Sequence, residues 1–158
     1  MMRLYYTQIP KQPTRQAQHE AEHRAGRALL CHALGCEEGD ILLRGDGKPY
    51  LPGGPWFSIS HSGGLVLLAV SELGEIGCDV EDTTRPLRSP ERIRAKIADP
   101  GEETLPLFQL WVKKEAEYKA CGPGYLYYPP MPEGFIAAVC CRAEEEVATA
   151  PAKFIAIL

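Results

Sequence analysis

The sequence predicts an α+β fold made of two similar αβ halves, each a helix packed on a small, mostly antiparallel sheet. Between residues 57 and 81, three apolar segments of strand length are separated by turns that contain glycine, which is typical of an antiparallel meander. A glycine followed by an apolar strand occurs at 64–70 and again at 134–140. This repeat favours two halves, which we place at residues 1–74 and 75–158 of one compact unit.

The N-terminal half begins with a strand and a long helix. Leu4–Thr7 is expected to form the strand, and Pro13-Thr14 introduces a helix that ends near Leu34, because Gly35 is a good left-handed terminator. The apolar stripe of this helix is expected at Ala21, Ala25, Ala28, Leu29, Leu30 and Leu34. A turn-rich stretch at 45–55 then leads into the strands at 57–60, 65–71 and 76–81.

The C-terminal half contains two further helices. Ser89-Pro90 supplies an N-cap serine and a proline in the first turn, which predicts a helix over 91–97. After the break at 99–101, a second helix is expected from about Leu105 to Cys121. The segment 123–134 is too rich in proline and glycine to be regular, and strands are expected at 135–141 and 153–158.

Composition excludes several classes of protein. A chain of 158 residues with 45% hydrophobic content can bury a real core, and a formal charge of −4 without a basic block gives no support for nucleic-acid binding. No apolar run reaches the roughly 18 residues that a membrane span needs, and nothing resembles a signal peptide. We therefore expect a cytoplasmic protein without a membrane partner, in which the six cysteines are reduced core residues.

Three carboxylates mark the candidate site. Asp79 and Glu81 lie two residues apart in a predicted strand and therefore project from the same face. Glu115 shares one stripe of the later helix with Trp111 and Lys119, and Lys113 and Lys114 adjoin it. Hard oxygen ligands suit Mg²⁺, which binds one or two protein carboxylates together with the phosphates of a substrate. The sequence therefore predicts a magnesium site with lysines facing a polyanion.

Each of these features also has a plain structural interpretation. The Asp79/Glu81 pair on its own is compatible with a solvated strand end. Glu115 and Lys119 form an i,i+4 pair, and such pairs usually stabilise a helix by only about 0.2–0.5 kcal/mol. His61, at a corner between a strand and a glycine turn, is also compatible with a structural histidine. The concentration of cations beside the three acids favours the functional interpretation.

Four motifs occur in a fixed order: Gly47-Lys48-Pro49, Phe57-Ser58-Ile59-Ser60-His61-Ser62-Gly63, Gly77-Cys78-Asp79-Val80-Glu81 and Trp111-x-x-Lys114-Glu115-Ala116-x-x-Lys119. In this order they resemble the 4′-phosphopantetheinyl transferases, from Arg24 to about Gly122 and more loosely over 135–140. The resemblance implies a holo-[acyl-carrier-protein] synthase type of enzyme. Such enzymes use Mg²⁺ to move the phosphopantetheine arm of coenzyme A to a serine of an acyl, polyketide or peptidyl carrier protein, and they release 3′,5′-ADP.

The resemblance also implies a role for individual residues. Asp79, Glu81 and Glu115 would bind Mg²⁺, and Glu115 would also take the proton of the attacking serine. Lys114 and Lys119 would contact the diphosphate, with Lys119 counted among the catalytic residues. The remaining contacts to coenzyme A would come from Ser60 and His61 at its phosphates, and from Lys48 and Arg24 near the adenosine 3′-phosphate. Arg27, one turn after Arg24, is an alternative for the last of these roles.

The position of Asp79 in the middle of the chain resembles the surfactin-type members, which fuse two αβ units into a pseudo-symmetric monomer, and not the trimeric single-unit type. The chain is short for that type, and Gly122-Pro123-Gly124 stands where many members carry Gly-Lys-Gly. A non-catalytic homologue that binds coenzyme A or a carrier protein is therefore the alternative. A third possibility is a small α/β domain unrelated to this family, but four motifs would then have to match by chance in the right order.

Overall fold

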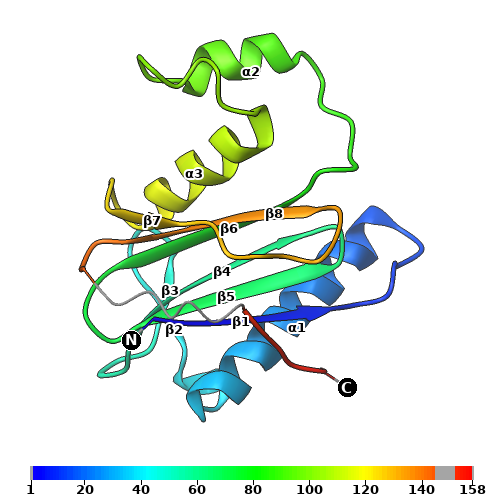
Figure 1. Cartoon of the computed structure of the whole chain (residues 1–158). Coiled ribbons are helices and arrows are strands. Elements are labelled where there is room, and N and C mark those ends of the chain that lie inside the picture. Colours follow the sequence, from blue (N-terminus) through cyan, green and yellow to red (C-terminus); the bar gives the residue numbers. More distant parts are fainter. Residues whose placement is uncertain (1, 145–151, 158) are drawn as a thin grey trace.

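The computed structural model describes residues 2–144 and 152–157. Helices α1 and α3 lie on the outer sides of two sheets, which pack against each other in between (Figure 1). A short 3₁₀ helix spans Glu38–Asp40. The other elements are β1 (Arg3–Gln8), α1 (Arg15–Leu34), β2 (Leu42–Leu43), β3 (Pro49–Tyr50), β4 (Trp56–Ser62), β5 (Leu65–Ser71), β6 (Ile76–Asp82), α2 (Pro90–Ile97), α3 (Leu107–Lys119), β7 (Tyr125–Tyr127), β8 (Phe135–Cys141) and β9 (Lys153–Phe154).

The two larger sheets are built in a similar way around one central apolar strand. In the first, of order β4-β5-β1-β9, the central strand β5 pairs antiparallel with β4 and β1, and β9 adds in parallel to β1. In the second, of order β6-β8-β7, β8 pairs antiparallel with both neighbours. The predicted α+β class with small, mostly antiparallel sheets is confirmed. Pseudo-symmetry between the halves and the division at residue 74 stay predictions.

Three apolar clusters hold the layers together. The innermost one lies between the two sheets and takes alternate residues of β5, β6 and β8, namely Leu65, Leu67, Ala69, Ile76, Cys78, Val80, Ala137, Val139 and Cys141. The opposite face of β5 packs on α1, and the opposite face of β8 packs on α3. Because side chains alternate along a strand, the odd-numbered residues of β6 face away from the inner cluster, on the side where α3 packs.

Strands β4 and β6 are the edges at which the two sheets meet, and side chains join them. The hydroxyl oxygens of Ser58, Ser60 and Ser62 accept hydrogen bonds from the backbone amides of Cys78, Val80 and Asp82, at 3.1, 3.2 and 3.0 Å. Both sets of residues have the period of two that a strand imposes. Three serines therefore satisfy the amides of a buried edge on which no strand of the described residues pairs.

Helix α3 crosses β6 directly at Gly77. A Cβ atom at this position would lie 2.1 Å from the carbonyl oxygen of Ala116 and 2.5 Å from the backbone nitrogen of Ala120. Only a glycine therefore lets the C-terminal part of α3 approach the strand this closely. This contact places Lys119 above Asp79, which follows Gly77 by two residues.

The boundaries of the long elements agree with the sequence predictions, and the caps of α1 confirm their chemistry. Thr14 Oγ1 accepts a hydrogen bond from the backbone amide of Ala17 at 3.1 Å, and Gly35 is left-handed with φ 64°. The prediction for Ser89 was wrong in detail. This residue precedes α2, but its left-handed backbone leaves the side chain without a capping hydrogen bond, and its carbonyl accepts from Arg92 and Ile93 instead.

Four other expectations need correction. Ala28 is exposed, because α1 turns Gly26 toward β4, where a Cβ would lie 3.3 Å from Ile59 Cγ2. Segment 123–134, expected to be irregular, contains strand β7, and the expected last strand is limited to β9 within the described residues. The cysteines are all free, but Cys121 is exposed, and Cys78, Cys140 and Cys141 are the ones that are buried.

None of the helices in the described part of the chain has the length and apolar character that crossing a membrane requires.

We predict that Gly77→Ala destabilises the protein by at least about 2 kcal/mol, because the added methyl meets the backbone of α3, which cannot move aside as a side chain would. Gly39→Ala is the matched control, since a methyl group added there would have nothing within 4 Å and its backbone is not left-handed, so its effect should stay within about 0.5 kcal/mol. Urea unfolding measures both values. Equal effects of the two substitutions would contradict the close crossing of α3.

Candidate functional site

Asp79 is the most deeply buried of the three predicted acids, with 4% of the residue exposed. Its Oδ1 accepts hydrogen bonds from Ser60 Oγ at 3.0 Å and from Lys119 Nζ at 3.1 Å. Its Oδ2 is also buried and has no hydrogen-bond partner among the described residues. An unpartnered buried carboxylate oxygen is unfavourable in a site that serves stability alone, and it points to a missing ligand.

The electrostatic environment of Asp79 opposes its ionisation. Burial raises the pKa of this carboxyl from 3.8 to about 6, the nearby Lys119 ammonium counteracts the rise, and the charge of Glu81 adds to it. A cation placed beside Asp79 and Glu81 would reverse both unfavourable contributions. The pair therefore has the electrostatic character of an incomplete cation site.

Glu81 lies at the end of β6 and is held from two sides. Its Oε2 accepts hydrogen bonds from Ser62 Oγ at 3.3 Å and from Arg85, whose closest nitrogen is 2.9 Å away. The guanidinium of Arg85 in turn lies over the ring of Phe108, 5.8 Å from its centroid. The predicted same-face arrangement follows from the strand, with Ser60 supporting Asp79 and Ser62 supporting Glu81.

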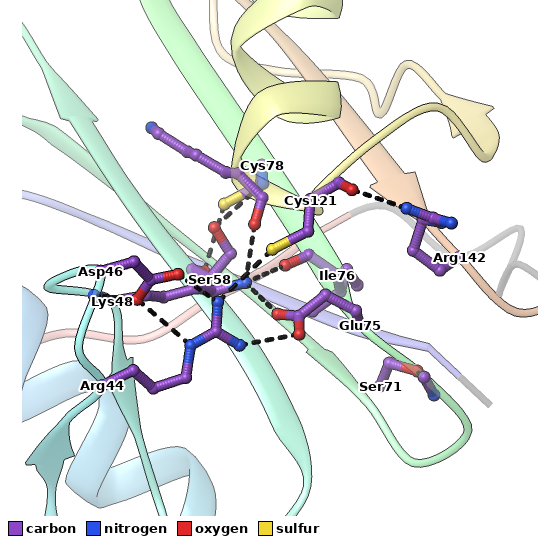
Figure 2. A network of polar contacts seen from close by, with 12 residues as sticks. Arg44, Asp46, Lys48, Ser58, Ser71, Glu75, Ile76, Cys78, Cys121 and Arg142 are labelled. Carbon is purple, nitrogen blue, oxygen red and sulfur yellow. Dashed lines mark hydrogen bonds and ion pairs between the residues drawn. The ribbon is translucent and has the colours of Figure 1, made fainter.

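Lys48 lies at the centre of a polar network between the β2–β3 hairpin, β6 and the end of α3. Its Nζ donates to Glu75 Oε1 at 2.5 Å, to the carbonyl of Ile76 at 2.7 Å and to the carbonyl of Lys119 at 2.8 Å. Figure 2 shows Arg44 and Lys48 converging on the Glu75 carboxylate. Burial alone would raise the pKa of Glu75, but these two cations together lower it.

The two other lysines of the helix motif are paired with acids from the segment between α2 and α3. Lys114 Nζ lies 2.5 Å from Asp99 Oδ2 and 2.6 Å from Glu102 Oε1. Lys113 also contacts Glu102 and lies 3.5 Å from Glu117. Hydrogen bonds from Lys113 and Lys114 lower the pKa of Glu102 to about 2. Asp99 and Glu102 thus occupy Lys114, one of the two lysines that the resemblance assigns to a diphosphate.

A large cavity with a volume of about 870 Å³ lies between the hairpin, β4 and α3. Four cationic side chains line it, namely Arg44, Lys48, Lys114 and Lys119. Each of the four is ion-paired with a carboxylate of the chain. Phe57, Ile59, Ile97 and Tyr118 contribute apolar surface. Asp46, Asp99 and Glu117 also line it, so the cavity combines charged groups of both signs with apolar surface.

A second cavity of about 370 Å³ adjoins the first, because Gly47, Pro49 and Ile59 line both. His61 and Arg27 line this second cavity, whereas Arg24 is exposed on α1 and does not. The Nδ1 atom of His61 contacts the carboxylate of Glu22. Glu22 is itself buried, and its other oxygen accepts hydrogen bonds from Gly64 N at 3.1 Å and Gln18 Nε2 at 2.8 Å.

Glu115 and Glu117 differ in a way that the sequence interpretation did not anticipate. Glu117, which the sequence motif leaves out, lines the large cavity beside Lys114 and Lys119. Glu115 is half-buried and does not line that cavity. No hydrogen bond or ion pair joins it to another of the described residues.

The donor set fits Mg²⁺ through two carboxylates. Across residues 2–144 and 152–157, no group of three or more His, Cys, Asp or Glu side chains is arranged to hold a metal ion. Mg²⁺ does not require such a group, because it commonly binds one or two carboxylates and fills its other positions with water and substrate phosphates. Asp79, with its unpartnered oxygen, and Glu81 supply that pair.

The structure thus brings some predicted residues together and separates others. Ser60, Asp79 and Lys119 are in contact, and Lys48 and Lys114 line the same cavity as Lys119. His61 lies in the adjoining cavity, and Arg24 lies outside both. Sequence reasoning missed Glu22 and Glu75, which pair with His61 and Lys48. The alternating serines of β4 were a signal for the contact with β6, but nothing local marked the two acids.

Known proteins give an independent comparison. No model of a protein family matches the chain. The 4′-phosphopantetheinyl transferase AcpT of Salmonella typhimurium is 33% identical over 119 residues, which are 68% of this chain and 62% of that protein. The protein of the same name from Escherichia coli (strain K12) is 34% identical over 111 residues, 62% of this chain and 56% of that protein. The 4′-phosphopantetheinyl transferase HetI of Nostoc sp. is 33% identical over 129 residues, 68% of this chain and 54% of that protein.

The chain belongs to the 4′-phosphopantetheinyl transferase superfamily. The family resemblance drawn from the four ordered motifs is therefore confirmed. The matches cover little more than half of the length of these relatives, at 62%, 56% and 54%. Superfamily membership and the site geometry thus come from separate observations.

We predict that Asp79→Asn changes how stability depends on pH. The pKa of this carboxyl in the folded protein, about 6, lies above its ordinary value of 3.8, so between these values the folded protein holds a proton that the unfolded chain has released. Wild-type stability without metal should therefore fall by roughly 2–3 kcal/mol as the pH rises through this window. Asparagine at position 79 cannot ionise, so the stability of the variant should not fall over this pH range.

Urea unfolding in EDTA at several pH values measures this effect. Above about pH 7 the Asn variant should be the more stable protein. A wild type that is more stable than the variant under these conditions would mean that the Lys119 ion pair outweighs the burial of the Asp79 charge.

Proposed function

We propose that the protein transfers the 4′-phosphopantetheine arm of coenzyme A to a serine of a carrier protein. The observation that carries the proposal is the Asp79–Lys119 contact beside a cavity lined with cations, in a chain related to proteins named 4′-phosphopantetheinyl transferases. Coenzyme A combines a diphosphate with an apolar arm and an adenosine 3′-phosphate. A cavity with cationic and apolar lining suits a ligand of that composition.

In this proposal the diphosphate binds at Lys114 and Lys119. Both ammonium groups now contact carboxylates of the chain, Asp99 and Glu102 in one case and Asp79 in the other. Binding would exchange the carboxylate contacts of Lys114 for contacts to phosphate oxygens, which are charge-assisted hydrogen bonds of the same class. The adenosine 3′-phosphate would extend into the second cavity, toward His61 and Arg27.

Asp79 and Glu81 would hold Mg²⁺, and Glu115 would join them once the substrate is bound. The ion supplies charge neutralisation for the diphosphate. The chain supplies the rest: Ser60 and Ser62 orient the two strand carboxylates, and the serine bridges to β6 keep that strand in place.

The transfer itself is a phosphoryl-type displacement. The hydroxyl oxygen of the carrier serine forms a bond to the β-phosphorus of coenzyme A, and the bond from that phosphorus to the bridging oxygen breaks. Glu115 takes the proton of the hydroxyl, directly or through water, and 3′,5′-ADP leaves with the bridging oxygen. Lys119 stabilises the charge that develops on the leaving group.

The same proposal includes the subtype of the enzyme, its oligomeric state and its carrier. We place the protein with the holo-[acyl-carrier-protein] synthase type of activity and with the two-unit surfactin-type members. It would act as a cytoplasmic monomer on an acyl, polyketide or peptidyl carrier protein.

A second candidate function is binding of coenzyme A or a carrier protein without transfer. Two observations favour it: the chain's own acids occupy Lys113 and Lys114, and Gly122-Pro123-Gly124 lacks the lysine found in many surfactin-type members. Incubation with coenzyme A, Mg²⁺ and a panel of apo carrier proteins, followed by mass spectrometry of the carriers, decides between the two. A carrier that gains one phosphopantetheine supports transfer. Coenzyme binding without a mass gain on any carrier supports the alternative.

We predict that Glu115→Gln abolishes transfer while the fold remains intact, because the change removes a ligand charge and the proposed base. Mass spectrometry of the carrier measures transfer, and circular dichroism measures the fold. The comparison variant is Glu117→Gln, two residues along the same helix, which should retain most of the activity. Loss of transfer in the Glu117 variant alone would move the base to the residue that lines the cavity.

We also predict that coenzyme A binds at least about tenfold more tightly than dephospho-coenzyme A, since each charge-assisted hydrogen bond to the 3′-phosphate contributes roughly 1.5–3 kcal/mol. Calorimetry on the two ligands measures the ratio. Arg27→Ala and His61→Ala should reduce it, because both residues line the second cavity, and Arg24→Ala should not. A ratio that falls only in the Arg24 variant would restore Arg24 as the phosphate contact.

A further inference from the structure

The end of α3 and the start of β6 are tied to the same ammonium group. Lys48 Nζ donates to the carbonyl oxygens of Lys119 and Ile76, at 2.8 and 2.7 Å, and its third acceptor is Glu75 Oε1 at 2.5 Å. An ammonium has three N–H donors, so each one has an acceptor within the chain. The side chain is only 15% exposed.

Both carbonyls need an outside donor. The last carbonyls of a helix have no partner within it, and those of Ala116, Glu117 and Tyr118 accept from the backbone amides of residues 120, 122 and 121. The carbonyl of Lys119 receives Lys48 instead, and a cation at this end also complements the helix dipole. The carbonyl of Ile76 lies at the start of the β6 edge whose later amides are satisfied by serines.

This arrangement bears directly on the proposed site. Asp79 follows Ile76 by three residues on β6, and the side chain of Lys119 contacts Asp79 Oδ1 at 3.1 Å. Lys48 thus anchors the backbone of Lys119 itself and, on the strand that carries Asp79, the backbone of Ile76. Glu75 is held in turn by Arg44 at 2.8 Å, which restrains Lys48 from the side of the β2–β3 hairpin.

We infer that Lys48 is a positioning residue that fixes Lys119 relative to Asp79, and that it serves the site through these backbone contacts and not by binding the coenzyme's 3′-phosphate. The inference rests on the proposed function. A phosphate contact would require Lys48 to give up either one of the two carbonyls, which would loosen the junction between α3 and β6, or the Glu75 carboxylate, which Arg44 also holds.

The test is Lys48→Met, which keeps the aliphatic stem and removes the three donors. Calorimetry should show that coenzyme A and dephospho-coenzyme A weaken by a similar factor, so that their ratio stays within about twofold of the wild-type value. Turnover should fall by about tenfold or more and require more Mg²⁺, because a displaced catalytic group is costly. Hydrogen exchange of the amides at residues 120–122 should become faster.

Three further variants make the result specific. Arg44→Met removes a partner of the same Glu75 carboxylate and a hydrogen bond to Cys121 Sγ at 3.4 Å, but it leaves the bond from Lys48 to the carbonyl of Lys119. Exchange at residues 120–122 should therefore change less than in Lys48→Met. Lys96→Met, on the exposed surface of α2, should leave activity and exchange unchanged. If the Lys48 variant does not fold, Glu75→Gln serves in its place, because it removes the charged partner that holds the Lys48 ammonium. Exchange should then become faster and turnover should fall, while the ratio of the two ligand affinities should stay unchanged.

A ligand ratio that collapses toward one in Lys48→Met, with unchanged exchange at the end of α3, would overturn the inference and make Lys48 a phosphate contact. Unchanged exchange and unchanged turnover would overturn it as well. Failure of the proposed function is a separate result, since it would appear as a wild type that modifies no carrier. In that case the exchange measurement still tests the role of Lys48.

Discussion

The arrangement of the whole site depends on the unpaired edge of strand β6. An edge buried between two sheets must find partners for its amides, and three serine hydroxyls of β4 supply them at every second residue. Because the period of the serines matches that of the strand, the contact also sets its register. A shift by one residue would turn Asp79 and Glu81 toward the apolar layer between the sheets. The serine bridges therefore decide which face of β6 carries the acids.

Helix α3 completes the site through an approach that only Gly77 permits. The helix backbone lies so close to the strand that Lys119 reaches Asp79, where burial has already raised the pKa of the carboxyl. The ion pair compensates only part of the desolvation, and one oxygen of Asp79 remains without a partner among the described residues. Such a site stabilises the fold poorly by itself, and it is suited to a further cation.

The cations that line the cavity beside this pair are already ion-paired with carboxylates of the chain. Lys114 contacts two carboxylates from the segment between α2 and α3, and Lys48 contacts one carboxylate and two carbonyls. These two lysines differ in what an anion would have to displace. Lys114 can exchange two carboxylates for phosphates with no change in backbone contacts, whereas two of the three donors of Lys48 hold backbone carbonyls and only the Glu75 carboxylate could be exchanged. Two lysines that the resemblance assigns to coenzyme contacts thus support different roles.

Local sequence determined most elements of the fold: Thr14 and Gly35 delimit α1, and the alternation of β6 places Asp79 and Glu81 on one face. The order of the motifs was enough to predict the superfamily. Tertiary structure alone decided which charges meet. Glu22 and Glu75 lie 39 and 27 residues from the His61 and Lys48 that they contact, and no local pattern encodes a pairing at that separation. Periodicity reports which face a side chain occupies, whereas its partner depends on how the layers pack.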